Sequence, residues 1–423
     1  MSRYDKYKDS GIAWIGEIPE GWEVKRISNF YSVRNEKVSD KDYSALSVTM
    51  QGIVPQLENA AKTNDGDNRK LVKAGDFAIN SRSDRRGSCG ISKYDGSVSL
   101  INTVLEPRSL MSPVFYNWLF RSSLFSDEFY KWGHGIVDDL WTTRWQEMKN
   151  ISIPAPSISE QQAIADHLDR KCAEIDELVA LQETMIEELK AYKQSVITEV
   201  VTRGLNPDAP LRDSGIAWIG SIPAHWEMKR IKNICSSNNM ALSDRTDKDY
   251  SFSYVDIGSV TYEKGITSSE IFTFGNAPSR ARRLVKTNDI IVSTVRTYLR
   301  AIDIIDTEDK ENSVYSTGFA ILTPKNNIIP KFLIHLCRSE YFTHQVSIFS
   351  SGINYPSINS SSLNGISVIT PPLQEQQAIA DHLDRKCEEI DKLIAIKQEK
   401  IEQLKEYKKS VIFEYVTGKK RVQ

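Results

Sequence analysis

EQQAIADHLDRKC stands at residues 160–172 of this chain and again, unchanged, at residues 375–387. A second block, DSGIAWIGEIPEGWEVKRI at residues 9–27, returns as DSGIAWIGSIPAHWEMKRI at residues 213–231, with fifteen of its nineteen positions unchanged. The stretches between these repeats barely resemble each other. Because internal repeats dictate architecture, the sequence predicts a duplicated frame that carries two different inserts.

Apolar side chains follow each copy of EQQAIADHLDRKC largely in steps of three, four or seven, the spacing that buries one helix face against a partner helix. The seam expected in the first copy is Leu168, Ile175, Leu178, Met185, Leu189, Tyr192 and Val196, and in the second Leu383, Ile390, Leu393, Leu404, Tyr407 and Val411. Helices of about 40 residues would each be about 60 Å long. Since each stripe needs a partner and the same chain offers a matching one, we predict an intramolecular antiparallel coiled coil.

The two inserts, about residues 28–155 (the first insert) and 232–370 (the second insert), mix short β-like runs with turns and brief helical stretches. The β-like runs are DFAIN at 76–80, DIIVSTV at 289–295 and FAILTP at 319–324, and the helical stretches are PVFYNWLFRS at 113–122 and PKFLIHLCRS at 330–339. The same order of elements can be traced in both inserts. We therefore expect two mixed α/β modules that share a fold and differ in surface.

Prolines and glycines mark where the long helices begin and end. Pro156 and Pro372 precede them, and Gly204 and Gly418 follow their last apolar positions. The predicted class is α+β, with two mixed α/β modules separated by two long helices and an internal pseudo-twofold duplication. The predicted segments are 1–155 (N-terminal block and first module), 156–204 (first helix), 205–371 (linker, second block and second module) and 372–423 (second helix and tail).

Composition is that of an ordinary soluble protein: 423 residues, 40% hydrophobic, 26% charged, with a net charge of −2. The near-neutral charge gives no global sign of nucleic-acid binding, although a basic face can coexist with acidic helices. No secretory signal or run of eighteen apolar residues is present, so we expect a cytoplasmic protein without a membrane partner. Five cysteines without a CxxC pair argue against a disulfide framework or a zinc site.

Familiar catalytic motifs are missing from the sequence, including GxxxxGK[ST], HExxH and a dinucleotide-binding glycine turn. NPDA at residues 206–209 lacks the second proline and the aromatic residue of a methyltransferase motif, and is typical of a turn. His167 and Cys172 recur as His382 and Cys387, but five residues on a helix turn about 140° around its axis, away from a common metal site. We therefore expect no catalytic residue, cofactor site or metal site in this chain.

The repeated block at residues 9–27 and 213–231 contributes four tryptophans, Trp14, Trp22, Trp218 and Trp226. Aromatic residues in such a block most often anchor a core or a joint between domains. A docking surface for two copies of one partner protein is the alternative.

Two basic clusters are the main candidates for function. Residues 69–86 hold six basic residues against Asp76 and Asp84, and residues 279–302 hold six against Asp289. Arginine can bind guanine O6 and N7 together or grip a phosphate, although a lone charged cluster is usually a solvated face. The candidate DNA contacts are Arg82, Arg85 and Arg86 in the first cluster and Arg280, Arg282, Arg283, Arg296, Tyr298 and Arg300 in the second. Arg144 in GHGIVDDLWTTRW (133–145) and Asn354 in SSGINYPS (350–357) are weaker candidates, because either could be structural.

The ordered alternation of these elements resembles the specificity subunits of type I restriction–modification systems. The resemblance covers nearly the whole chain and rests on the two DSGIxWIGxIPxxWExKRI blocks, the EQQAIADHLD helix starts and the two unlike inserts. It implies that the inserts are target recognition domains, each reading half of a split, asymmetric sequence in double-stranded DNA. The helices would then set the length of the unread spacer.

The same resemblance implies that the chemistry belongs to other subunits. Two modification subunits would dock on the near-twofold frame and methylate adenine with S-adenosylmethionine, and motor-nuclease subunits using ATP and Mg²⁺ are further candidate partners. The chain itself would be a non-catalytic recognition subunit. The alternatives are a duplicated coiled-coil scaffold that binds proteins without reading DNA, and an autonomous methyltransferase or nuclease, which the missing motifs disfavour.

Overall fold

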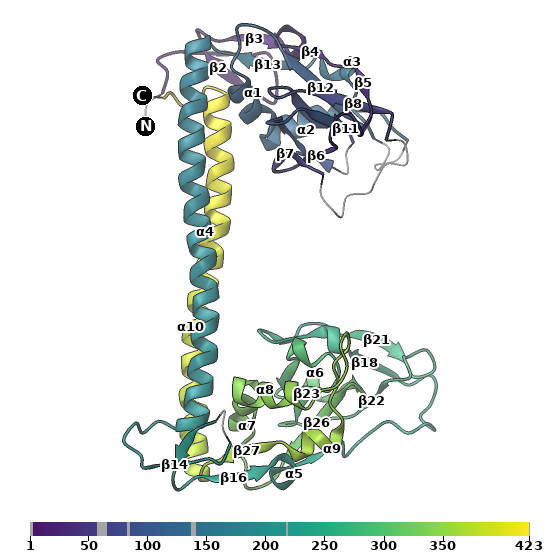
Figure 1. Ribbon diagram of the computed structural model, residues 1–423, viewed down its shortest axis with the longest axis vertical. Coiled ribbons are helices and arrows are strands. Elements are labelled where there is room, and N and C mark those ends of the chain that lie inside the picture. Colours follow the sequence, from purple (N-terminus) through teal and green to yellow (C-terminus); the bar gives the residue numbers. More distant parts are fainter. Residues whose placement is uncertain (1–2, 57–65, 83–84, 137–140, 217–218, 423) are drawn as a thin grey trace. The chain divides into compact units, whose positions relative to one another are not determined.

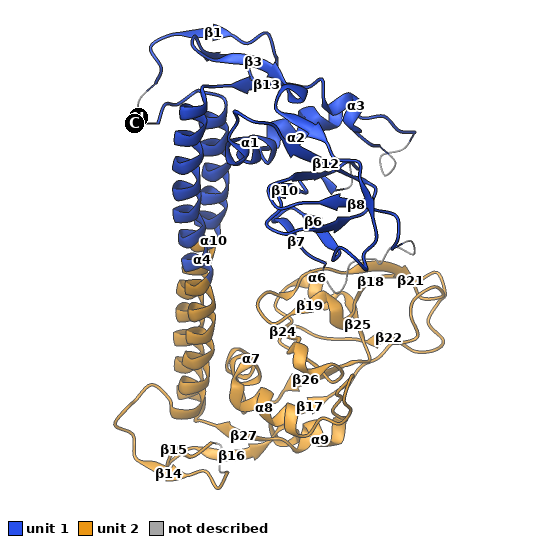
Figure 2. Cartoon of the chain, turned by 45° about the horizontal axis from the view of Figure 1, so that its top comes forward, with its two compact units in different colours: residues 1–183, 398–423 blue, residues 184–397 orange. Residues whose placement is uncertain are grey.

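The computed structural model describes residues 3–56, 66–82, 85–136, 141–216 and 219–422. The chain divides into two compact units, unit 1 (residues 1–183 and 398–423) and unit 2 (residues 184–397), which Figure 2 shows in two colours. Each unit holds one insert and half of each long helix. No helix in the described part is long and apolar enough to cross a membrane.

Two long helices, α4 (Ile158–Arg203) and α10 (Leu373–Val416), lie side by side (Figure 1), as the sequence predicts. The same ion pair occurs twice between them, with the helices interchanged: Lys408 of α10 lies 2.6 Å from Asp176 of α4, and Lys193 of α4 lies 2.7 Å from Asp391 of α10. Lys193 and Lys408 are at equivalent positions of the two helices, as are Asp176 and Asp391. Such reciprocal pairing is what a twofold relation between antiparallel helices requires. The predicted intramolecular antiparallel coiled coil is confirmed.

The seam of the coiled coil differs from the predicted one. Leu178, Tyr192, Leu393 and Tyr407 were expected inside but are 40–51% exposed. Five predicted seam residues are buried, namely Leu168, Ile175, Leu383, Ile390 and Val411. Isoleucines outside the predicted seam are buried too, so that Ile164, Ile175, Ile186 and Ile197 in α4, and Ile379, Ile390 and Ile401 in α10, follow an eleven-residue spacing. Eleven residues make three turns of 3.67 residues, close to the 3.6 of a straight helix, whereas a heptad requires 3.5. The predicted seam is therefore correct at Ile175 and Ile390 and wrong at Leu178, Tyr192, Leu393 and Tyr407.

The first insert forms two sheets in unit 1. One has the strand order β10-β9-β12-β4 and the other β11-β8-β5, with the hairpin β6-β7 beside them. The strands are β4 (Tyr31–Val33), β5 (Lys37–Val38), β6 (Leu46–Thr49), β7 (Gly52–Pro55), β8 (Arg69–Val72), β9 (Phe77–Asn80), β10 (Cys89–Ile91), β11 (Gly96–Val98) and β12 (Asn102–Pro107). Helices α1 (Pro113–Phe120), α2 (Ser123–Lys131) and α3 (Trp145–Met148) follow. Aromatic residues of α1 and α2 share one buried core with the four-stranded sheet and the start of α4.

The second insert repeats the main sheet in unit 2 as β17-β26-β23-β24, so β9 corresponds to β23 and β12 to β26. The remaining strands differ: β21-β18-β25-β22 form a second sheet in which β18 and β25 are parallel, and β19-β20 is a hairpin. The strands are β17 (Cys235–Ser237), β18 (Ser251–Val255), β19 (Val260–Thr261), β20 (Gly265–Ile266), β21 (Glu270–Thr273), β22 (Ala281–Arg283), β23 (Ile290–Ser293), β24 (Ile302–Ile304), β25 (Ser313–Ser316) and β26 (Phe319–Pro324). The helices are α5 (Ile231–Ile234), α6 (Glu308–Glu311), α7 (Pro330–Arg338), α8 (Glu340–Ile348) and α9 (Ser360–Gly365). A shared frame with different additions is thus confirmed.

One turn shows how two unlike sequences build that frame. The carboxylate of Asp76 accepts from the backbone N–H of Lys73 at 2.9 Å, and Asp289 accepts from Lys286 at 2.8 Å. The residue before each aspartate has positive φ, +94° at Gly75 and +72° at Asn288. Glycine and asparagine are the residues that adopt this conformation at low cost. Both aspartates therefore terminate a tight turn that leads into the central strand.

The repeated blocks at residues 9–27 and 213–231 form small sheets at the ends of the long helices. Strands β1 (Tyr7–Asp9), β2 (Glu17–Pro19), β3 (Glu23–Arg26) and β13 (Ser152–Ala155) belong to unit 1, and β14 (Leu211–Asp213), β15 (Ser221–Pro223), β16 (Glu227–Arg230) and β27 (Ser367–Thr370) to unit 2. Trp14, Trp22 and Trp226 are at most 9% exposed and belong to the main cores. The core interpretation is confirmed for these three, and Trp218 lies outside the described residues.

The repeat EQQAIADHLDRKC fastens each insert to its helix. Gln161 accepts from the backbone N–H of Ser112 and Gln376 from that of Ile329, both at 2.8 Å. Each glutamine is almost fully buried and also donates to the carbonyl of a preceding proline. Eight residues later, Asp169 accepts from the indole N–H of Trp118, and Asp384 lies 2.8 Å from Nε2 of His335. Both copies of the repeat therefore make equivalent contacts, with α1 in unit 1 and with α7 in unit 2.

Candidate nucleic-acid interface

In unit 2, the loop that leaves β23 is tied to the loop that leaves α8. The backbone N–H of Ile358 donates to the carbonyl of Thr294 at 2.8 Å, and the hydroxyls of Thr297 and Ser350 lie 3.0 Å apart. Val295 and Ser357 form an antiparallel bridge between the same two loops. The structure thus brings together the predicted residues Arg296, Tyr298 and Arg300 on one loop and Asn354 on the other.

Arg296 and Arg300 flank a single 3₁₀ turn, Thr297–Leu299, and both are left-handed, with φ of 50° and 49°. A non-glycine residue costs about 1 kcal/mol in this conformation, and such strain collects at functional sites. The Arg296 guanidinium lies 5.2 Å from the ring centre of Tyr355, and that of Arg300 lies 5.9 Å from the ring of Tyr262. Neither is in an ion pair within the described residues. Both charges are therefore available to an external anion.

Polar and aromatic side chains surround these charges. Tyr298 is 61% exposed and Tyr355 is 66% exposed. Asn354, which directly precedes Tyr355, is exposed as well. Amide and guanidinium groups can read base edges, and aromatic rings can stack on bases. The surface has the chemistry of a nucleic-acid contact.

Unit 1 contains the same junction with different side chains. The backbone N–H of Thr143 donates to the carbonyl of Ser81 at 3.0 Å, and Arg82 forms an antiparallel bridge with Thr142. Arg144, the next residue, is exposed at the start of α3, and its backbone N–H donates to the Glu147 carboxylate. The predicted Arg82 and Arg144 therefore lie on paired segments.

The other arginines of the first cluster are more constrained. Arg85 and Arg86 are exposed, and Arg86 lies 3.4 Å from Asp127 and 5.2 Å from the ring centre of Tyr130. Arg69 is buried and donates to Ser97. Residues 83–84 of this cluster and 137–140 of the segment 133–145 lie outside the described residues, Asp84 among them.

The second predicted cluster is divided between two sheets. Arg280, Arg282 and Arg283 lie on or beside β22, whereas Arg296 and Arg300 follow β23. Arg280 donates to Asp256 at 2.9 Å, Arg282 lies 4.6 Å from the ring centre of Phe274, and Nε of Arg283 is buried, which lowers the pKa of that guanidinium. Arg280 and Arg282 are thus engaged within the module, whereas Arg283 is partly buried with no hydrogen bond at Nε. The role of all three as DNA contacts stays a prediction.

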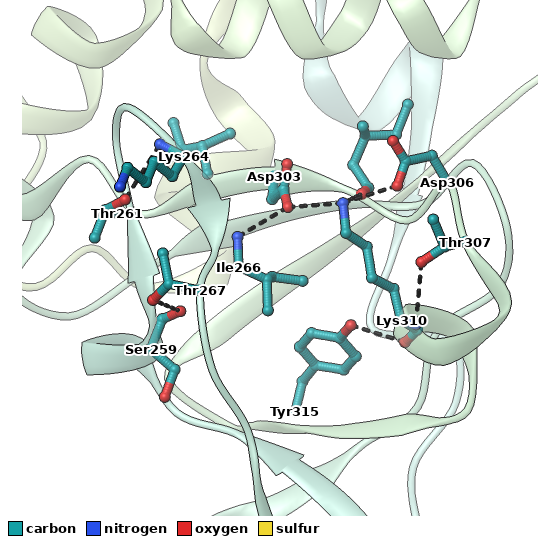
Figure 3. Close-up of polar contacts among 12 residues, drawn as sticks. Ser259, Thr261, Lys264, Ile266, Thr267, Asp303, Asp306, Thr307, Lys310 and Tyr315 are labelled. Carbon is teal, nitrogen blue, oxygen red and sulfur yellow. Dashed lines mark hydrogen bonds and ion pairs between the residues drawn. The ribbon is translucent and has the colours of Figure 1, made fainter. Parts of the chain in front are cut away.

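A buried carboxylate holds the strand that leaves the Arg296–Arg300 loop. Asp303 on β24 accepts from the backbone N–H of Ile266 and lies 3.0 Å from Nζ of Lys310 and 3.0 Å from Nη2 of Arg338. Figure 3 shows Lys310 reaching between Asp303 and Asp306. Paired and hydrogen-bonded on several sides, the buried charge is satisfied. It joins β24 to the hairpin β19-β20, to α6 and to the end of α7.

Sequence reasoning missed two side chains at these junctions. Ile136 and Ile353 are 97% and 99% exposed, the highest values among the large hydrophobic residues that the structure describes. A signal was present, since both follow a glycine, in GHGIV and SSGIN. Tyr355, under Arg296, was also missed.

Comparison with known proteins finds similar sequences among the specificity subunits of type I restriction enzymes. Residues 223–406 match the family model described as type I restriction modification DNA specificity domain. The specificity subunit of the type I restriction enzyme MjaVIII from Methanocaldococcus jannaschii is 27% identical over 96% of this chain and 94% of its own length.

Two solved structures share the fold. One, from work on complex assembly and conformational transition of the type I R-M system, aligns with a TM-score of 0.68 and 16% identity, covering 94% of this chain and 98% of the other. The HsdS subunit from Thermoanaerobacter tengcongensis aligns with a TM-score of 0.53 and 16% identity over 95% and 98%.

Proposed function

We propose that this chain is a specificity subunit of a type I restriction–modification system, and that each of its two inserts reads one half of a bipartite, asymmetric DNA target. One observation carries the proposal. The loop after the central strand meets a second loop in the same way in both inserts, but the side chains differ, Arg82 with Thr142 in one and Val295 with Ser357 in the other. Equal frames with unlike loops suit two unlike half-sites, because base contacts and not the frame specify sequence.

The long helices supply the proposed spacer. A helix of 46 residues such as α4 is about 69 Å long. Each insert is fastened to the start of one long helix through a buried glutamine, Gln161 or Gln376. In this proposal the length of the coiled coil sets the number of unread base pairs.

We further propose that two modification subunits dock on the duplicated frame and methylate adenine, with S-adenosylmethionine bound by them. A motor-nuclease subunit would supply ATP and Mg²⁺ chemistry. This chain would then recognise DNA without binding a cofactor or catalysing a reaction. The absence of catalytic motifs from its sequence supports that division of labour.

Long-read methylome sequencing of cells that express this chain with its modification subunit tests the proposal. We expect an adenine-methylated motif with two unlike halves and an unread gap. Exchange of residues 28–155 for the same insert of a relative should change one half only. A continuous or palindromic motif, or the loss of both halves on exchange, would contradict independent reading.

Salt-dependent gel shifts separate DNA recognition from a protein-binding scaffold. Arg296→Ala together with Arg300→Ala should weaken DNA binding and reduce the slope of log K against log salt by about 1 for each phosphate that is no longer bound. Lys392→Ala is the matched control, because Lys392 is an exposed cation of the coiled coil paired with Glu388. Equal, salt-insensitive affinity of all three proteins would favour the scaffold.

A further inference from the structure

Ile136 and Ile353 occupy the same structural position in the two inserts. His134 and Thr142 exchange both backbone hydrogen bonds, at 3.0 and 2.9 Å, and Ser351 and Ser357 do so at 2.9 Å. Each isoleucine lies two residues beyond the first member of its bridge. The second residue of each bridge, Thr142 or Ser357, also forms a bridge with the loop after the central strand, at Arg82 or Val295.

Full exposure of an isoleucine has no packing explanation here. Burying such a side chain would be worth about 1.5–3 kcal/mol, which neither insert gains from its own fold. A single exposed apolar residue is ordinary. The same residue at the same point of two inserts that share little other sequence indicates a common contact outside the chain.

The surroundings indicate the chemistry of that contact. Ile353 is followed by exposed Asn354 and Tyr355, and Arg296 lies over the Tyr355 ring. Ile136 lies two residues after His134. The bridge partner of His134, Thr142, also forms a bridge with Arg82. Val295, Leu299 and Phe349 on the same two loops are also 36–51% exposed, but Arg296, Arg300 and Asn354 interrupt these apolar residues along the chain. A protein partner would favour an uninterrupted apolar patch, whereas apolar side chains interspersed with cations and hydrogen-bonding groups match a DNA groove, where phosphates flank apolar base surfaces.

We propose that Ile136 and Ile353 are apolar DNA contacts, one in each recognition insert, that enter a groove and pack against the apolar surface of a base. This inference rests on the proposed DNA-reading function. The surface is either a thymine methyl group or the face of a base at an opened step. Each isoleucine acts at the half-site of its own insert.

The test uses the full chain with its modification subunit, a duplex carrying the motif found by methylome sequencing, and a random-sequence duplex of equal length. Ile353→Ser should weaken binding to the motif duplex about tenfold. The salt slope should not change, because isoleucine neutralises no phosphate. Ile353→Leu should retain affinity, and Ile136→Ser should act like Ile353→Ser at the other half-site.

Ile271→Ser is the matched control, since Ile271 is 80% exposed in the same unit but on β21, in the second sheet. Unchanged affinity of Ile353→Ser and Ile136→Ser, while the Arg296/Arg300 variant still binds DNA less tightly, would overturn this inference and leave the proposed function standing. Weaker binding of the modification subunit at unchanged DNA affinity would also overturn it.

The source of the apolar surface is identified with 2-aminopurine placed along each half-site. Fluorescence that rises on binding, and not with the serine variant, identifies an opened base step. Fluorescence that stays constant, with weaker binding when thymine is replaced by uracil, identifies the methyl group. Either result supports the contact, and sensitivity to neither change refutes it.

Discussion

Gln376→Ala should destabilise unit 2 far more than its position at a helix start suggests. The side chain is 1% exposed, accepts from the backbone N–H of Ile329 at 2.8 Å, and donates to the carbonyls of Pro371 at 2.8 Å and Asn327 at 3.3 Å. Alanine leaves one backbone donor and two carbonyl acceptors, all buried or partly buried, without this partner. At about 1–3 kcal/mol for each unsatisfied group, the free energy of unfolding should fall by about 3 kcal/mol.

The neighbouring residue provides the control. Gln377 is exposed and donates only to Asp381, four residues along the same helix, so Gln377→Ala should change stability by less than about 0.5 kcal/mol. Urea denaturation of the full chain measures the total effect, and hydrogen exchange of α7 and β27 assigns it to unit 2. Gln161→Ala and Gln162→Ala repeat the comparison in unit 1. Equal stabilities of Gln376→Ala and Gln377→Ala would refute the anchoring role of the repeat.

Three further outcomes follow from buried or strained groups. Asp303→Asn should lower the free energy of unfolding of unit 2 by about 3 kcal/mol in urea titrations, because Lys310 and Arg338 lose a buried counter-charge; an unchanged midpoint would contradict this. Hydrogen bonds, chiefly from His335 and also from Lys331, lower the pKa of Asp384 from 3.8 to about 2. The stabilisation by the Asp384 carboxylate is therefore complete above about pH 4 and is lost as the pH falls towards 2. Between these pH values the melting temperature of Asp384→Asn should vary less with pH than that of the unchanged protein. Gly418→Ala should lower the melting temperature of unit 1, since φ is +73° and a Cβ would meet Pro19 and Trp22; the exposed Gly11→Ala, with φ of +72° and open space, separates clash from backbone strain.

Helices and strands were predicted best from the sequence where one short run of residues forms the whole element. PVFYNWLFRS and PKFLIHLCRS became α1 and α7, and DIIVSTV contains β23. The coiled-coil partner was predictable because the repeat supplied it. The seam was predictable only in part: Ile175 and Ile390 are buried as expected, but steps of three, four and seven fit Leu178 and Tyr192 as well as they fit the buried Ile186.

The candidate site was predictable as a set of residue types and not as a surface. Arg82 and Arg144 are 62 positions apart, and the bridge at Thr142 and the hydrogen bond from Thr143 to Ser81 bring their segments together. Arg280 and Arg296 are close in sequence, yet they lie next to strands of two different sheets, β22 and β23. Of these two, only Arg296 is outside an ion pair within the described residues. Charge is a property of composition, whereas its availability depends on which carboxylates and rings the fold places beside it.

By itself the sequence determined the duplication and the long helices, and indicated the family that the chain resembles, because repeats and periodic apolar residues can be recognised without knowledge of contacts. The tertiary structure decided what the repeat EQQAIADHLDRKC does, since the partners of Gln161 and Gln376 lie 47 to 49 positions away. It also decided which arginines carry an available charge and placed an exposed isoleucine beside each junction. Such assignments depend on long-range hydrogen bonds and burial, which no local pattern encodes.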